Sequence, residues 1–400
     1  MSPKLDPRGL RRLHESLAAH VDADALPGVA ALVAAGDHVH VEVIGSSRFG
    51  GPPLARDAIW RIASLTKPVV AAAALSMLAD GTLDLDQAVD DLLPELAGRR
   101  VLRAVDAELD DTVPAERPIT VGDVLTYRIG LGSVMAPPGS FPIQRAEAAL
   151  GLRSIGSPPW PPVDHDDDSW IAALGTLPLA HQPGTAWMYN TSGQVLGVLL
   201  ARADGAPLEA VLRRRIFDPL GMTDTSFTIA PDRQARLVTF YAPDADTGGL
   251  AVIDDPGDSW WAPPLRFADG SGMLLSTIDD YWAFVAMLRA GGVHRGERIL
   301  PADLVTRMTT DQLSADQRAG NELFLDVDGG WGLGMGTAAT GSEAAPLPCG
   351  YGWAGGSGTS WRTHAVSGVT GILLTQRAMM SPAPTPIMRD FWPAVTAAVR

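Results

Sequence analysis

Lysine is nearly absent from this chain of 400 residues, because Lys4 and Lys67 are the only two among its 31 basic side chains. Arginine therefore fills almost every cationic role. Arginine is too basic to give up its proton, so it cannot replace lysine where a neutral amine is needed. A lysine retained at position 67 therefore indicates a task that requires an amine able to accept a proton.

Cysteine and long apolar runs are also lacking. Cys349 is the single cysteine, which excludes an internal disulfide framework and suits a reducing compartment. No run of about eighteen apolar residues occurs, as a membrane-spanning helix would need. The first residues also lack the apolar core of a signal peptide. We therefore expect a cytoplasmic protein that does not enter a membrane.

Basic charge is deficient, with 46 acidic residues against 31 basic ones and a net charge of −15. Binding of nucleic acid relies on basic patches, so no nucleic-acid partner is expected. His14 and His20 do not show the i, i+4 spacing of zinc-protease helices. The run Asp166–Asp168 is better explained as the cap of a following helix. We expect no metal and no organic cofactor, and the sequence leaves the oligomeric state open.

The segment Ser64-Leu65-Thr66-Lys67 carries the strongest chemical signal. Residues three apart share one helix face, so the Ser64 hydroxyl and the Lys67 amine can meet. A serine hydroxyl attacks poorly unless a neighbouring group takes its proton. Apolar residues flank the segment on both sides, which indicates a buried helix that begins at the serine.

Strand-like and helix-like patterns alternate so that strands occupy both ends of the chain. The patterns predict a hairpin over 28–44, a short strand at 60–62 and strands near 351–353, 360–366 and 371–376. They predict helices at 10–20, 66–79, from 83 onward, 119–126, 193–203, 208–217, 281–290 and 387–399, and long loops over 136–169 and 244–264. One antiparallel sheet flanked by helices, with a mostly helical insertion, is an α/β (α+β) architecture. We assign residues 1–80 and 265–400 to a sheet domain and 81–264 to a mostly helical domain, with the active site in the cleft between them.

The chain resembles the serine β-lactamase and penicillin-binding-protein superfamily over nearly its whole length. The class C-like branch and the family VIII carboxylesterases are the most similar. Ser64–Lys67 matches the S-x-T-K element, and Leu125–Leu131 resembles the helix end that commonly reads L-T-H-T-S-G-L. Tyr189–Thr191 resembles the Y-x-N motif, and Gly270–Met273 the glycine-rich turn that follows. The resemblance implies a β-lactamase/transpeptidase-like fold.

The resemblance also implies roles for three side chains. Ser64 would be the acylated nucleophile and Lys67 its proton partner. Tyr189, shifted toward phenolate by the nearby cation, would act first as base and then as acid toward the leaving group. Tyr127 is a rival tyrosine, but it occupies the position of a structural histidine in the family.

Two departures from the family pattern bear on the substrate. Thr191 stands where the family asparagine holds a substrate amide, while asparagine has moved to Asn190, and the sequence leaves open which of them takes that role. No lysine follows Lys67, so the lysine of K-T-G is replaced by Trp353 in a W-x-G form. Trp353 would offer an apolar wall to an uncharged group, and the Gly356 N–H would complete an oxyanion hole with that of Ser64.

These residues indicate a serine hydrolase that cleaves small carboxylic esters through an acyl-enzyme on Ser64. The alternatives are a β-lactamase or D-alanyl carboxypeptidase-type amide hydrolase, an acyltransferase that uses the same site, and a non-catalytic binding protein. Ser357 lies in a sequence close to the G-x-S-x-G elbow, but a strand follows it and not the required helix. His364 is expected to be a sheet residue and not a triad base.

Overall fold

A seven-stranded antiparallel sheet organises the computed structural model, which describes residues 3–152, 163–325, 328–338 and 350–400. The strand order is β11-β12-β13-β14-β15-β1-β2. The strands are β1 Gly28–Ala35, β2 His38–Gly45, β11 Gly329–Trp331, β12 Gly336–Ala338, β13 Gly350–Gly355, β14 Thr359–His364 and β15 Thr370–Thr375. Because β1 pairs with β15, strands from the two ends of the chain lie side by side in one sheet. Cys349 lies outside the described residues.

Strand β1 is buried along its whole length, which explains its unbroken apolar sequence. Its side chains alternate between two hydrophobic clusters. Ala30, Leu32 and Ala34 belong to the larger cluster, which extends into the helical part of the molecule. Alternate residues of the same strand pack with α1 (Pro7–Asp22) and α13 (Pro386–Ala397). The sheet therefore separates two cores.

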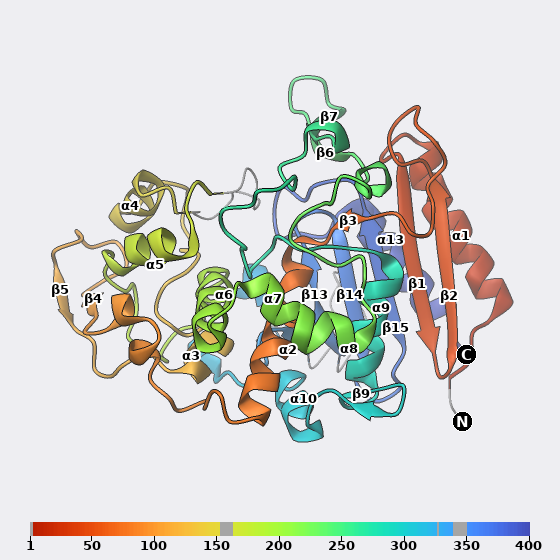
Figure 1. The fold of residues 1–400 in the computed structure, drawn as a ribbon. Helices are drawn as coiled ribbons and strands as arrows, with labels where there is room; N and C mark the ends of the chain where they lie inside the picture. The colour runs from red at the N-terminus through yellow and green to blue at the C-terminus, as the bar shows by residue number, and fades with distance from the viewer. Residues whose placement is uncertain (1–2, 153–162, 326–327, 339–349) are drawn as a thin grey trace.

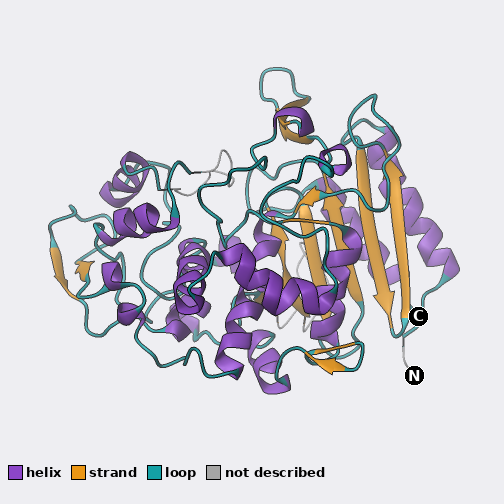
Figure 2. Ribbon diagram, viewed as in Figure 1, coloured by secondary structure: helices purple, strands orange, loops and turns teal. Residues whose placement is uncertain are grey.

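Helices cover both faces of the sheet. Helices α1 and α13 pack together on one face, and α9 (Ile278–Arg289) contacts β1 and β15 from the other (Figure 1). The segment between β2 and α9 supplies most of the helices and loops that lie outside the large sheet (Figure 2). Its helices are α2 Thr66–Ala79, α3 Val121–Leu125, α4 Pro142–Ala149, α5 Asp167–Gly175, α6 Thr191–Asp204, α7 Leu208–Leu212 and α8 Asp218–Leu220.

Short elements complete the fold. The remaining helices are α10 Ala302–Met308, α11 Ala315–Arg318 and α12 Glu322–Leu325. Four two-stranded sheets are formed by the pairs β3 Trp60–Arg61 with β8 Leu275–Ser276, β4 Arg100–Leu102 with β5 Thr112–Pro114, β6 Phe240–Pro243 with β7 Leu250–Asp254, and β9 Val293–His294 with β10 Glu297–Arg298. The β6–β7 hairpin projects from the rest of the molecule (Figure 1).

The structure confirms the predicted fold class and most predicted elements. Three expectations were wrong. Residues 83–88 form no helix, and only the short 3₁₀ turns Val89–Asp91 and Pro94–Leu96 that follow are helical. The stretch 136–169, expected to be a loop, contains α4, because Pro142 opens a helix that buries Ile143. Strand β7 lies within the loop expected at 244–264. Strands β11 and β12, of three residues each, were not predicted at all.

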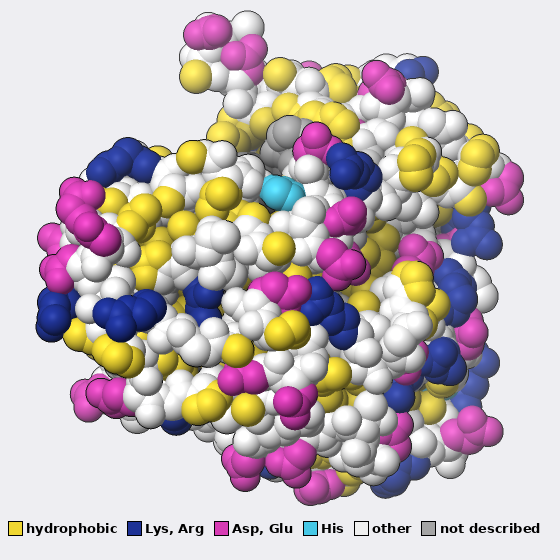
Figure 3. All heavy atoms as spheres, turned by 60° about the vertical axis from the view of Figure 1, so that its left-hand side comes forward, with side chains coloured by type: hydrophobic (Ala, Val, Ile, Leu, Met, Phe, Trp, Pro, Cys, Tyr) yellow, Lys and Arg dark blue, Asp and Glu magenta, His cyan; other side chains and the backbone are white. Residues whose placement is uncertain are grey.

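The distribution of surface charge and the lengths of the helices match what the composition predicts. On the face shown in Figure 3, basic side chains lie singly or in small groups among acidic ones. Among the described residues, no helix is both long enough and apolar enough to cross a membrane. The exact division into a sheet domain and a helical domain stays a prediction.

Candidate active site

Ser64 lies at a strained junction between strand β3 and helix α2. The strand pairs with β8, and the Ile62 N–H donates to the Leu274 carbonyl at 3.0 Å. Ala63 then adopts a φ of 44°, a region that costs a non-glycine residue about 1–2 kcal/mol. A 3₁₀ turn over Ala63–Leu65 leads into α2. Ser64 is half-buried while its neighbours are buried, so the turn leaves this residue partly exposed.

Lys67 is buried with 1% exposure, and its ammonium donates to three acceptors. These are Ser64 Oγ at 2.9 Å, Asn190 Oδ1 at 2.9 Å and the Ser271 carbonyl at 2.5 Å. Asp269 fixes the turn that presents this carbonyl, since it accepts from the Ser271 N–H at 2.7 Å. Three neutral acceptors match the three protons of an ammonium group. The three contacts therefore fix the Lys67 side chain, which in turn holds Ser64 Oγ in place, and its role as proton partner stays a prediction.

Tyr189 reaches Ser64 from the segment before α6. Its hydroxyl donates to Ser64 Oγ at 2.8 Å and accepts from Trp353 Nε1 at 2.9 Å. The Lys67 ammonium lies 4.6 Å from the centre of the tyrosine ring. Phe324 stacks on the ring with centroids 4.3 Å apart, and Trp187 lies at 5.8 Å. Ser64 Oγ thus contacts both predicted proton carriers.

Asn190 and Thr191 differ sharply in what they contact. Asn190 adopts a φ of 80° and directs its side-chain oxygen to Lys67. Asparagine tolerates such backbone angles better than most residues, which explains its presence there. Thr191 opens helix α6 and is buried with 7% exposure. The structure therefore places Asn190, and not Thr191, beside the reacting groups, whereas substrate contact by either stays a prediction.

Tyr127 is poorly suited to act as a base. It is 1% exposed and lies against Trp331, with ring centroids 4.6 Å apart. Burial raises the pKa of Tyr127 well above its usual value of 10, and the charges of Tyr189 and Asp269 raise it further. A phenol held neutral in this way cannot remove a proton near neutral pH.

The β13–β14 turn approaches the nucleophile segment closely. A Cβ atom on Gly355 would lie 2.5 Å from the Ile62 carbonyl oxygen, so only glycine allows this approach. Thr359 Oγ1 ties the two segments together by donating to the same oxygen at 3.0 Å. Gly356 is the next residue in the turn, and a Cβ atom there would meet nothing within 4 Å. Its amide as an oxyanion donor stays a prediction.

Ser357 and His364 take structural roles. Ser357 is 1% exposed, and its hydroxyl donates to the Arg61 carbonyl, which pins the turn to strand β3. His364 lies on β14, where its Nδ1 contacts Ser367 Oγ at 2.7 Å. Among the described residues, no group of three or more His, Cys, Asp or Glu side chains is arranged to hold a metal ion.

A buried ion pair anchors the strand that delivers Ser64. Arg61 contacts Asp254, and the two side chains are 2% and 0% exposed. Asp254 also accepts from Ser259 Oγ at 2.8 Å and from the Trp260 N–H at 2.7 Å, so its oxygens are well satisfied. The Arg61 guanidinium lies 5.0 Å from the centre of the Trp261 ring. Strand β3 is thereby fixed to the loop after β7.

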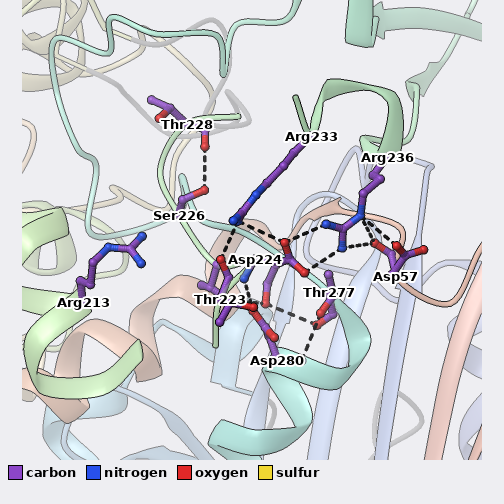
Figure 4. A network of polar contacts seen from close by, with 12 residues as sticks. Asp57, Arg213, Thr223, Asp224, Ser226, Thr228, Arg233, Arg236, Thr277 and Asp280 are labelled. Atoms are coloured by element: carbon purple, nitrogen blue, oxygen red, sulfur yellow. Dashed lines mark hydrogen bonds and ion pairs between the residues drawn. The ribbon is translucent and has the colours of Figure 1, made fainter. Parts of the chain in front are cut away.

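A second polar network fixes the chain just before β3 (Figure 4). Arg236 pairs with Asp224 at 2.7 Å and with Asp57 at 3.1 Å. Asp280, near the start of α9, accepts from the Asp224 N–H at 2.8 Å. Figure 4 shows these side chains converging from separate segments. The segment of chain that leads into β3 and Ser64 is therefore fixed by contacts with several other segments.

Several contributors to the site were not predicted from the sequence. Phe324 stacks on Tyr189 from a segment 135 residues further along the chain, and Trp331 packs against Trp353. The Asn321 side chain holds this region by donating to the Trp187 carbonyl at 2.9 Å. No local motif marks these residues. The carbonyl of Ser271 was equally invisible, since a backbone acceptor leaves no signature in residue type.

Comparison with known proteins identifies the family. The sequence profile of the family described as Beta-lactamase matches residues 13–386. Protein Rv1367c of Mycobacterium tuberculosis (strain ATCC 25618 / H37Rv) is 38% identical over 319 residues, which cover 78% of this chain and 76% of that protein. Esterase EstB of Burkholderia gladioli is 29% identical over 417 aligned positions, covering 96% of this chain and 97% of the esterase.

A solved structure agrees with these matches. EstCE1, described as a hydrolase with promiscuous acyltransferase activity, superposes with a TM-score of 0.80 at 21% identity and covers 97% of this chain and 98% of its own. At that identity the likeness establishes the β-lactamase/transpeptidase-like fold. The resemblance to serine β-lactamases, penicillin-binding proteins and their esterase relatives is confirmed, and the chain belongs to the beta-lactamase family.

Proposed function

We propose that this protein is a serine hydrolase that cleaves small carboxylic esters through an acyl-enzyme on Ser64. The observation that carries the proposal is the position of Ser64 Oγ, which lies 2.9 Å from Lys67 Nζ and 2.8 Å from the Tyr189 hydroxyl. A nucleophile, a fixed cation and a proton carrier within hydrogen-bond reach are what acyl transfer by a serine requires. Esterases among the relatives support the same activity.

The first half of the reaction forms the acyl-enzyme. Ionised Tyr189 takes the proton of Ser64, whose oxygen attacks the carbonyl carbon of the ester. The charge that develops on the carbonyl oxygen is stabilised by the N–H groups of Ser64 and Gly356, as an oxyanion hole. When the tetrahedral intermediate collapses, Tyr189 returns the proton to the departing alkoxide, which leaves as an alcohol. Lys67, 2.9 Å from Ser64 Oγ, is the second group placed to exchange a proton with the nucleophile.

The second half releases the acid. Water attacks the acyl-enzyme, and Tyr189 takes one proton of that water while the new oxyanion occupies the same hole. Collapse of this intermediate releases the carboxylic acid and returns the proton to Ser64. An alcohol in place of water would give a new ester, so the same site could act as an acyltransferase. EstCE1 is described as a hydrolase with promiscuous acyltransferase activity, which supports acyl transfer as a second candidate activity.

Trp353 favours an uncharged substrate. The position that holds a lysine in β-lactamases is occupied here by a tryptophan with 8% exposure. An indole offers apolar surface and a single N–H, so it cannot pair with the carboxylate of a β-lactam or a peptide. We therefore expect hydrolysis of β-lactams and of D-alanyl peptides to be slow at best.

The test measures hydrolysis of p-nitrophenyl acetate and butyrate beside the β-lactam nitrocefin, with the wild type and Ser64→Ala in parallel. We expect turnover of both esters, loss of that turnover in Ser64→Ala, and little reaction with nitrocefin. Brisk nitrocefin hydrolysis would contradict the argument from Trp353 and favour a β-lactamase. Ester turnover that persists in Ser64→Ala would refute the acyl-enzyme. If the wild type turns over none of the three compounds, covalent labelling by a fluorophosphonate decides between two explanations. Labelling of Ser64 would indicate an enzyme with narrow substrate specificity, and no labelling would indicate a binding protein.

A further inference from the structure

Trp353 makes a contact that an apolar wall does not need. Its indole Nε1 lies 2.9 Å from the Tyr189 hydroxyl oxygen, and the two rings are 5.7 Å apart at 43°. An indole N–H can only donate, so the tyrosine oxygen must be the acceptor. The bond is also sheltered, because the tryptophan side chain is buried.

The neighbouring cation does not supply this donor. Lys67 directs its three N–H bonds to Ser64, Asn190 and Ser271, and its ammonium lies 4.6 Å from the centre of the tyrosine ring. Within the described part of the chain, the indole is the group that donates to the oxygen of Tyr189. When this oxygen is ionised, the bond becomes charge-assisted and therefore stronger than in the neutral phenol. A partly buried site strengthens it further.

We propose that the Trp353 N–H stabilises the phenolate form of Tyr189 and so sets the pH at which this tyrosine can take a proton. Trp353 is then a positioning residue that acts through Tyr189, in addition to lining the substrate pocket. The inference rests on the proposed function for its effect on rate, because it assumes that Tyr189 is the base. Its effect on the ionisation of Tyr189 does not depend on any turnover.

Trp331 provides a matched control. It belongs to the same aromatic cluster, lies 4.8 Å from Trp353 in a T-shaped contact and is fully buried. Its Nε1 has no hydrogen-bond partner among the residues that the structure describes. Trp353→Phe and Trp331→Phe therefore each remove one indole from one cluster, but only the first removes a hydrogen bond to Tyr189. Substitution of Trp353 by benzothienylalanine, in which sulfur replaces the N–H, removes the donor and keeps the ring size.

The first measurement is the pH dependence of kcat/KM for p-nitrophenyl butyrate. A hydrogen bond to a charged group is worth about one to two pH units of ionisation. We expect the acidic limb of the profile to move to higher pH by about that amount in Trp353→Phe and in the benzothienylalanine variant, with kcat/KM at a fixed pH below the limb about 10–100-fold lower. Trp331→Phe should leave the limb where the wild type has it. If both Trp353 variants raise KM but leave the acidic limb at its wild-type pH, Trp353 only lines the substrate pocket, and the proposal is overturned.

The second measurement needs no turnover. Tyrosinate absorbs in the near ultraviolet, and the difference between each protein and its Tyr189→Phe counterpart isolates the titration of that one tyrosine. We expect this titration at higher pH in both Trp353 variants than in Trp331→Phe. If Ser64→Ala keeps the ester activity, the proposed function fails while this titration still decides the role of Trp353. Equal titration in the wild type and the benzothienylalanine variant would overturn the inference.

Discussion

Gly355→Ala tests how closely the β13–β14 turn must approach the nucleophile. The added Cβ would lie 2.3 Å from Thr359 Oγ1 and 2.5 Å from the Ile62 oxygen, where ordinary contact begins at 3.4 Å, so the Thr359 side chain must move and the two segments must separate by about 0.9 Å. Ile62 lies two residues before Ser64, and the next residue of the turn is Gly356. Separation of the segments therefore widens the gap between the two amides proposed to hold the oxyanion.

The expected cost follows from this displacement. A misplacement of about 1 Å at a reacting centre costs on the order of 10²-fold in rate. We therefore expect kcat/KM for p-nitrophenyl butyrate to fall about 100-fold in Gly355→Ala. Overpacking of this kind costs about 1–3 kcal/mol, so the variant should still fold, as a thermal melt would show. Gly356→Ala should lose less activity, because its Cβ meets no atom within 4 Å and the N–H remains.

Two results would refute this reasoning. Activity of Gly355→Ala close to that of the wild type would mean that the approach is not needed for catalysis. A larger loss in Gly356→Ala than in Gly355→Ala would mean that space for the substrate, and not placement of the turn, dominates at this position. A Gly355→Ala protein that fails to melt cooperatively would be compared at lower temperature, where the same order of activities is expected.

Further predictions concern charge. Lys67→Arg should lose nearly all ester turnover while keeping its charge, because a bulkier guanidinium cannot reproduce the three contacts of the buried ammonium; turnover near the wild-type rate would contradict this. Asp254→Ala should lower the free energy of unfolding by about 3–5 kcal/mol in a urea titration, because it leaves the buried Arg61 unpaired. Asp111→Ala, which removes the partner of an exposed arginine, should cost at most about 1 kcal/mol. Burial raises the pKa of Glu147 from 4.5 to about 8, so the folded state binds the extra proton and its stability should fall as pH rises from about 4.5 to 8. Glu147→Gln should flatten this dependence in thermal melts and be the more stable protein at pH 8, by an upper limit of several kcal/mol; parallel profiles would contradict the shift.

The sequence predicts the fold well where local patterns suffice. The hairpin β1–β2 and the helix after Ser64 have clear periods and turn residues, and both form close to their expected bounds. Strands β11 and β12 are three residues each and contain glycine, so no period could develop. Helix α4 was missed because proline and glycine around it suggested a loop, although proline at the first position of a helix is favourable.

The contacts of the candidate site also fall into two groups, those that follow from local sequence and those that depend on how distant segments pack. Ser64 and Lys67 are one helical turn apart, so their contact follows from the period of the helix alone. The contact between Asn190 and Lys67 cannot be predicted in this way, because a motif compares residue types at fixed positions. Asn190 stands one position before the motif's asparagine, and its φ of 80° accompanies a side chain directed to Lys67. The same limit applies to Trp353. Its identity argues for an apolar wall, but the direction of one N–H depends on how β13 and the segment before α6 meet, 164 residues apart. A substituted motif can therefore change the contact made at one position, here from an amine expected to bind a carboxylate to an indole that donates to the Tyr189 hydroxyl, and only the packing of distant segments reveals the new contact.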